Sequence, residues 1–106
     1  MSTDPDRPLP YRLRLFVAGS TVLSRRAIEN LRRICRDRLD GHVDLEVVDI
    51  YQQPELAASH QVIAAPTLLK LLPLPVRRII GDLSDTERVL RALDLTPLPP
   101  ATDHAA

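Results

Sequence analysis

The chain has 106 residues, 44% of them apolar, which suits one compact domain and leaves little room for two. Its 14 basic and 14 acidic residues give a formal net charge of zero, so the overall charge gives no reason to expect nucleic-acid binding. The single cysteine excludes an internal disulfide and a multi-cysteine metal site. No apolar stretch is long enough to span a membrane, and we expect a cytoplasmic protein.

Both ends of the sequence are rich in proline and small polar residues. Such residues offer little apolar surface that a core could bury. We therefore predict disordered tails over residues 1–10 and 96–106, and one ordered domain over residues 11–95.

The first half of this domain predicts a strand, a helix and a second strand. Apolar residues alternate over 11–17, which is typical of a strand, and we expect this strand at the centre of a sheet. Ser24 is the predicted N-cap of the helix, and Gly41 suits the left-handed position after its end. Residues 43–48 alternate again, so a helical crossover would make the two strands parallel. The helix is predicted from apolar residues at three- and four-residue spacing: Ala27, Ile28, Leu31, Ile34, Cys35 and Leu39.

The second half predicts a short helix, two strands and a last helix. Pro54 is placed to begin the short helix. Pro66 marks the entry to a strand over 67–72, because proline cannot donate to a sheet, and a strand over 76–80 completes an antiparallel hairpin. Ser84, with Glu87 three residues on, predicts the start of a helix that runs to Leu93.

The predicted order βαβαββα resembles the α/β plan of thioredoxin-like domains. In those domains the strand after the second helix is entered through a cis-proline, and the stretch Ala65–Thr67 stands where that loop belongs. A cis bond before Pro66 is therefore implied by the resemblance and not by the dipeptide, because X-Pro bonds favour trans.

Thiol chemistry of the thioredoxin kind would need cysteines between the first strand and the first helix. That stretch reads "GSTVLS" and contains none. Cys35 lies on the apolar stripe of the predicted helix, so a buried structural role is favoured. His42, His60 and His104 show no metal-site spacing and are expected on the surface. We predict no enzyme activity, no cofactor and no metal; a thioredoxin-fold enzyme that uses Cys35 is the alternative.

Two pairs of arginines have no obvious structural purpose. Arg25 and Arg26 are predicted in the first turn of the first helix, where positive charge opposes the helix dipole. Arg77 and Arg78 are neighbours on a strand, so their side chains must point to opposite faces of the sheet. They are either solvated arginines or part of a partner-binding patch.

Several stretches in order resemble the KaiB family: "LRLFVAGST", "RAIENLRRIC", "LEVVDIYQQPELA", "VIAAPTLLKLLPLPVRRIIGDLSD" and "VLRALDL". The resemblance covers residues 13–95. It implies a non-enzymatic clock or timer protein that binds the N-terminal ATPase ring of KaiC and promotes the dephosphorylated state of KaiC. Where a KaiA is present, the resemblance implies that the complex sequesters it. An alternative is a KaiB-like stress or signalling adaptor that binds a sensor kinase.

The resemblance also implies two folds. One is the βαβαββα monomer that binds KaiC, and the other is a βαββααβ resting form that self-associates as a dimer or tetramer. The run "TLLKLLPLPVRRII" has few β-branched residues before Val76, so its helix and strand preferences are close. Ala92 stands where many members have glycine, and alanine favours the last helix by about 0.5–1 kcal/mol.

Matching positions supply the candidate residues. The resemblance implies partner binding by Arg26, Gln61, Arg77, Arg78 and Asp82. It implies a role in fold switching for Pro66, Ala92 and Asp94. Gln61 replaces a lysine that is common in the family.

Overall fold

A computed structural model of the chain describes residues 11–40 and 42–95. The predicted tails, residues 1–10 and 96–106, lie outside the described residues, as does Gly41. The elements have the predicted order βαβαββα. They are β1 (Tyr11–Val17), α1 (Val22–Arg38), β2 (Val43–Asp49), α2 (Pro54–Ser59), β3 (Thr67–Leu72), β4 (Arg77–Ile80) and α3 (Thr86–Ala92).

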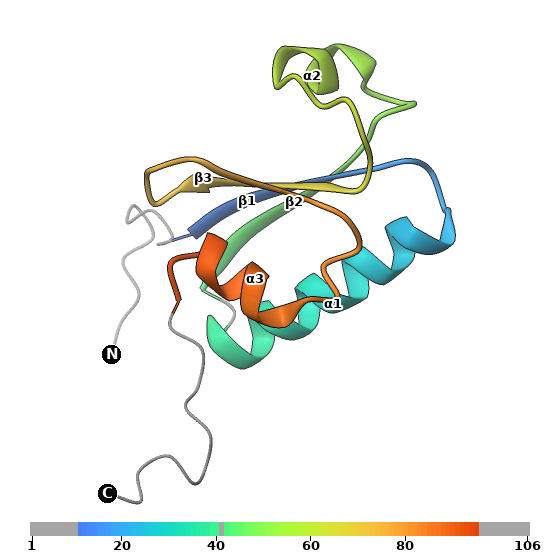
Figure 1. Cartoon of the computed structure of the whole chain (residues 1–106). Coiled ribbons are helices and arrows are strands. Elements are labelled where there is room, and N and C mark those ends of the chain that lie inside the picture. The colour runs from blue at the N-terminus through green and yellow to red at the C-terminus, as the bar shows by residue number, and fades with distance from the viewer. Residues whose placement is uncertain (1–10, 41, 96–106) are drawn as a thin grey trace, which may run out of the picture.

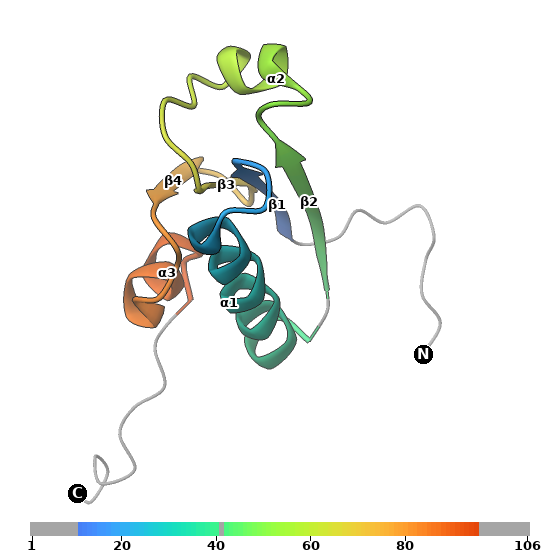
Figure 2. The same cartoon turned by 90° about the vertical axis from the view of Figure 1, so that its right-hand side faces the viewer.

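The four strands described form one sheet in the order β2-β1-β3-β4, so the prediction that β1 is central is confirmed. β1 is parallel to β2, as the helical crossover predicted, and Phe16 lies opposite Val48. β3 is antiparallel to β1 and to β4, with Thr67 opposite Phe16 on one side and Ile80 on the other. Helices α1 and α3 cover one face of the sheet, and α2 lies over the other (Figures 1 and 2).

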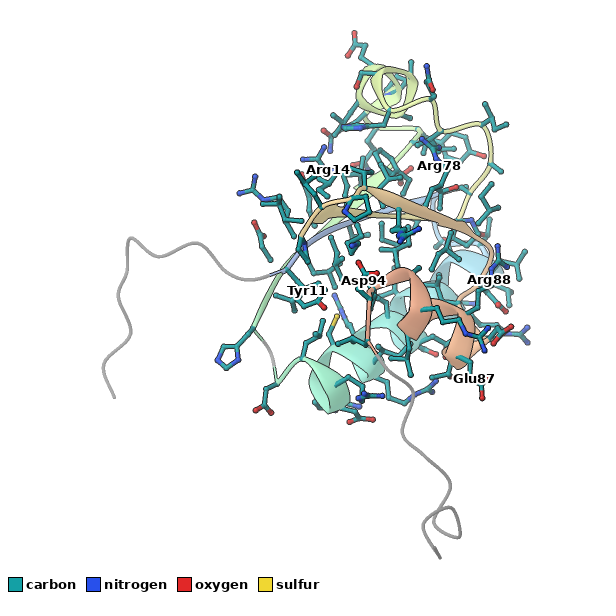
Figure 3. All side chains as sticks on the ribbon, turned by 60° about the vertical axis from the view of Figure 1, so that its left-hand side comes forward. Tyr11, Arg14, Arg78, Glu87, Arg88 and Asp94 are labelled. Carbon is teal, nitrogen blue, oxygen red and sulfur yellow. The ribbon has the colours of Figure 1, made fainter. Side chains whose placement is uncertain are left out.

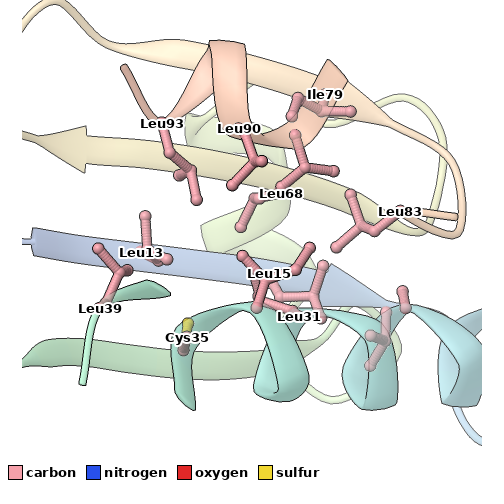
Figure 4. Packing of buried hydrophobic residues seen from close by; sticks show 14 residues of the cluster. Leu13, Leu15, Leu31, Cys35, Leu39, Leu68, Ile79, Leu83, Leu90 and Leu93 are labelled. Carbon is pink, nitrogen blue, oxygen red and sulfur yellow. The ribbon is translucent and has the colours of Figure 1, made fainter. Parts of the chain in front are cut away.

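The face under α1 and α3 holds the main core (Figure 4). Alternate residues of β1 meet the apolar stripe of α1 there, as the two periodicities predicted. Leu68 and Ile79 continue the core across β3 and β4, and α3 closes it. The buried members are Leu13, Leu15, Val17, Ala27, Leu31, Ile34, Cys35, Leu39, Leu68, Ile79, Leu83, Val89, Leu90 and Leu93.

The face under α2 holds a much smaller core. Its buried members are Phe16, Val48, Ala57 and Leu69, from β1, β2, α2 and β3. Ala57 is the only residue of α2 that is buried. Apolar burial therefore attaches α2 to the sheet only weakly.

The prediction that Ser24 caps α1 is wrong. The N-cap is Thr21, whose Oγ1 accepts a hydrogen bond from the Ser24 backbone N–H at 3.3 Å. Ser24 is buried, and its own hydroxyl accepts from the Ala18 N–H at 3.0 Å. The helix thus begins three residues earlier than predicted, and Arg25 and Arg26 fall beyond its first three positions, where the dipole opposes them less.

The predicted cap of α3 is wrong by one residue. The N-cap is Asp85, whose Oδ1 accepts from the Arg88 N–H at 3.2 Å, whereas Ser84 lies in the preceding turn. The Ser84 N–H instead donates to Asp82 Oδ1 at 3.1 Å. Ser84 and Asp85 are both suitable capping residues by type. Ser84 is held in the turn by Asp82, and Asp85 is the cap.

Candidate partner-binding surface

One end of the sheet exposes apolar side chains from several loops. The register puts the ends of β1, β2 and β4 and the start of β3 at this end. Ile63, in the loop before β3, is 91% exposed, and Tyr51, directly after β2, is 73% exposed. We define the docking surface as the exposed apolar residues at this end: Val22, Leu23, Tyr51, Ile63 and Ile80. Exposed apolar groups collected in this way indicate an interaction site.

Gln61 and Arg78, two of the predicted partner-binding residues, lie together beside this surface. The Arg78 guanidinium donates to the backbone carbonyl of Gln61 at 3.1 Å and to that of His60 at 2.6 Å. Gln61 follows α2 and its C-cap residue with a positive φ of 57°, a conformation that ends a helix. Arg78 therefore satisfies two carbonyls at the end of α2, where the helix dipole is negative.

His60, which we predicted on the surface, is only partly exposed and makes side-chain contacts. It is half-buried at the end of α2, and its Nε2 lies 2.9 Å from Arg14 Nη1. Arg14 also donates from Nε to Glu46 of β2 at 2.8 Å. The His60 and Phe16 rings lie 5.8 Å apart between centroids. A histidine in a short polar helix carries no sequence signal for this contact, because β1 lies far away in the chain.

Arg77 lies on the opposite face from Arg78, as the strand pattern predicted. In Figure 3, Arg78 lies on the α2 side of the sheet, and Asp94, the partner of Arg77, lies on the other side. Its Nη2 lies 3.7 Å from Asp94 Oδ1, directly after α3. Asp94 also accepts a hydrogen bond from Lys70 Nζ at 2.5 Å. That hydrogen bond, followed by the positive charges of Lys70 and Arg77, holds the pKa of Asp94 below its ordinary value.

Lys70 is the functional candidate that sequence reasoning missed. It is the only lysine of the chain, and its side chain is 1% exposed in the middle of β3. The sequence did contain a signal for it, because this lysine stands inside the apolar run "TLLKLL". Side chains two apart on a strand share a face, so Lys70 must lie on the core side of the sheet with Leu68, opposite to Leu69. Close by, the Tyr11 hydroxyl donates to the Leu93 carbonyl at 2.8 Å, and burial followed by the charge of Asp94 raises the pKa of Tyr11.

Arg26 and Asp82 lie near the start of α1 and the start of α3. Hydrogen bonds from Ser84 hold the pKa of Asp82 below its ordinary value, and the charge of Arg26 contributes in the same direction. Asn30 of α1 donates to the Asp82 backbone carbonyl at 2.9 Å. These contacts join α1 to the turn after β4. They share no residue with the contacts made by Arg77 and Arg78.

The three residues predicted for fold switching are spread over two elements. Pro66 is buried, and the peptide bond before it is cis, as the resemblance implied. Its carbonyl accepts from the Gly81 N–H at 3.0 Å. Ala92 ends α3 and packs partly buried against the main core, and Asp94 follows with a positive φ of 61°. The structure thus brings Asp94 to Lys70 and Arg77 and leaves Pro66 in the loop before β3.

Cys35 lies inside the main core and is 5% exposed. Burial raises the pKa of its thiol to about 11, so the thiol is protonated at neutral pH. A protonated, buried thiol is a poor nucleophile, and this placement speaks against the alternative of a thiol enzyme. Within residues 11–40 and 42–95, no three His, Cys, Asp or Glu residues are grouped so that they could hold a metal ion. The helices in that same part of the chain are too short or too polar to cross a membrane.

Solved structures that superpose on this chain include thioredoxin-like folds. The N-terminal domain of Synechococcus elongatus SasA superposes with a TM-score of 0.68 and 24% identity over 89% of this chain and 93% of that one. Oxidised mitochondrial thioredoxin 3 from Saccharomyces cerevisiae gives 0.66 and 20% identity over 81% and 79%. These matches confirm the predicted fold class.

Comparison of sequences identifies the family, whereas the solved structures show only the fold. The chain is 53% identical over 85 residues to the circadian clock oscillator protein KaiB of Prochlorococcus marinus (strain MIT 9312), which is 80% of this chain and 81% of that protein. It is 45% identical to circadian clock protein KaiB3 of Synechocystis sp. (strain ATCC 27184 / PCC 6803 / Kazusa), over 80% of this chain and 83% of that one. The family model of the KaiB domain matches residues 14–95. The chain therefore belongs to the KaiB family of circadian clock proteins.

Proposed function

We propose that this protein is a non-enzymatic regulator that binds the N-terminal ATPase ring of a KaiC-type protein and promotes its dephosphorylated state. Membership of the KaiB family supports the class of partner. The observation that carries the proposal is the docking surface, which exposes Tyr51 and Ile63 beside α2. Aromatic and large aliphatic residues in such positions are common anchors of protein interfaces.

Polar groups beside the docking surface support the same assignment. Gln61 keeps its side chain exposed there, and Arg26 lies exposed near the start of α1. Arg77 and Arg78 both make contacts within the domain, so their part in binding is proposed to include the shape of the surface as well as its charge.

The proposal includes a second fold of the C-terminal half, as the resemblance implied, with self-association in that form. In the fold described here, Asp94 joins the end of α3 to β3 and β4 through Lys70 and Arg77. Any rearrangement that moves α3 away must break these pairs. Secondary chemical shifts across residues 68–80, together with native mass, test this part. Helical shifts and a higher mass are expected for the second form. If neither is observed under any condition, this part of the proposal is wrong.

Binding to a KaiC homologue tests the main proposal. We expect association that depends on the nucleotide held by the ring and that weakens at least about tenfold in Tyr51→Ser and Ile63→Ser. Leu74→Ser is the matched control, because Leu74 is 71% exposed but lies in the β3–β4 turn at the other end of the sheet. No association in any nucleotide state would reject the proposal. Binding to a sensor kinase alone would favour the adaptor alternative.

A further inference from the structure

Helix α2 has few of the features that normally hold a helix in place. It has six residues, buries only Ala57, and its N-cap residue Gln53 makes no side-chain capping hydrogen bond. A helix this short is not stable by itself in water. Its pose beside the docking surface must therefore depend on other contacts.

Those contacts converge on His60, the C-cap residue that follows α2. Arg78 of β4 contacts the His60 carbonyl at 2.6 Å through Nη2 and the next carbonyl through Nη1. Arg14 of β1 contacts the His60 ring at 2.9 Å, and its side chain is only 21% exposed. We call Arg14, His60 and Arg78 the His60 cluster. Hydrogen bonds from charged donors are stronger than neutral ones, and a planar guanidinium can serve two acceptors at once.

We propose that Arg14 and Arg78 are positioning residues, which set the affinity of the docking surface by fixing the pose of α2 through His60. The inference rests on the proposed function, because it assumes that the partner binds beside α2. It assigns to Arg78 a role inside the domain, whereas the sequence resemblance implied contact with the partner.

The chemistry of the Arg14 contact fixes which atom donates and which accepts. Arginine has only donors, so His60 Nε2 must accept, and the neutral ring carries its proton on Nδ1. The charged groups around His60 are Arg14 from β1, Glu46 of β2, which pairs with Arg14, and Arg78 from β4.

Amide exchange without any partner tests the positioning role. The N–H groups of Gln61 and Val62 donate to Ala58 and Ala57 carbonyls, so their exchange rates report the end of α2. We expect them to rise about tenfold in Arg14→Ala and Arg78→Ala. Arg12→Ala is the matched control for Arg14, since Arg12 lies on the same face of β1 and pairs with Asp44 of β2 without contacting α2. Unchanged exchange in both cluster variants would overturn the proposal.

A double-mutant cycle separates the two contacts. His60→Ala removes the ring, and with it both the Arg14 and the Phe16 contact, and keeps the carbonyl. Adding Arg14→Ala to it should therefore speed α2 exchange no further than His60→Ala alone. His60→Ala and Arg78→Ala should add, because Arg78 contacts only the backbone. Additivity between His60→Ala and Arg14→Ala would contradict the assignment.

Ring binding then connects the cluster to function. We expect affinity for the KaiC homologue to fall in Arg78→Ala in proportion to the gain in α2 exchange, and Arg78→Lys to restore only part of it, because an ammonium cannot serve both carbonyls in the same geometry. Loss of affinity with unchanged exchange would show direct contact and overturn the positioning role. If the parent protein binds no ring, the proposed function fails, and the exchange and cycle measurements still decide whether the His60 cluster positions α2.

Discussion

The two faces of the sheet are covered in different ways. Among residues 11–40 and 42–95, the face under α1 and α3 buries 14 apolar residues in one cluster, whereas the face under α2 buries four. On the second face, side chains of Arg14 and Arg78 supply the contacts that apolar burial does not. We infer that packing on the first face supplies most of the folding stability, whereas the short helix on the second face can detach locally by breaking a few polar contacts.

A similar contrast exists within the face under α1 and α3. Helix α1 is held by apolar packing along its length, while the end of α3 is also joined to the sheet by Asp94. The pair has unequal partners, since Lys70 is 1% exposed and Asp94 is 41% exposed. Removing either partner should therefore have different consequences.

The largest expected effect comes from truncating the main core. Leu31→Ala should lower the free energy of unfolding by about 2–5 kcal/mol, because Leu31 is fully buried and its truncation removes apolar packing and leaves a cavity. Leu56→Ala on α2 should cost about 1 kcal/mol or less, because Leu56 is only partly buried. Urea denaturation followed by circular dichroism measures both. Equal losses would show that the two faces contribute alike to stability.

The next effect concerns the pair at the end of α3. Asp94→Asn should lower the Tm by several degrees, because it leaves the buried Lys70 charge without its partner. Lys70→Met should cost less, since water can solvate the partly exposed Asp94 and methionine fills the space. Thermal scans at neutral pH compare the two variants. A larger loss in Lys70→Met would contradict this account.

The same pair predicts a pH dependence. The pKa of Asp94 is lower in the folded protein than its ordinary value of 3.8, so the folded state gains stability from the ionised carboxylate above that value. The gain is lost as the pH falls through the folded-state pKa. In acid denaturation below about pH 4, the parent protein should lose stability more steeply than Asp94→Asn. Parallel acid limbs would indicate that other carboxylates, such as Asp82, carry the effect.

The smallest effect compares the starts of α1 and α2. Thr21→Ala should cost about 1 kcal/mol, because the Thr21 hydroxyl accepts from the Ser24 N–H. Gln53→Ala should leave stability almost unchanged, since Gln53 makes no capping hydrogen bond. Urea midpoints at constant slope measure the difference. If Thr21→Ala leaves the free energy of unfolding unchanged, the Thr21 cap contributes nothing to stability and this prediction is wrong. Ser24→Ala tests a different contact, the buried hydrogen bond from the Ala18 N–H to the Ser24 hydroxyl.

The order of elements and the main core followed from local patterns. Alternation over residues 11–17 and the three- and four-residue spacing of Ala27, Leu31 and Cys35 fix which side chains face the core, whatever their partners are. The ends of elements were less predictable. Thr21 and Ser24, or Ser84 and Asp85, are equivalent caps by residue type, and contacts with Ala18 and Asp82 decided between them.

The candidate site was predicted in part. Adjacent positions on a strand placed Arg77 and Arg78 on opposite faces, but no pattern could supply their partners, because Asp94 and the carbonyls after α2 come from other elements. His60 was misread for the same reason, since its contact with Arg14 joins residues that are 46 positions apart. Lys70 could have been found, because its place in an apolar run already required a buried charge.

By itself, the sequence determined the α/β order, the KaiB family and the absence of a cysteine where thiol chemistry would need one, because these depend on neighbouring residues and on periodicity. The tertiary structure alone decided that Arg14 and Arg78 meet at His60 and that Lys70 meets Asp94. Hydrogen bonds and ion pairs act over a few ångströms in space, and only the folded chain brings such distant positions that close.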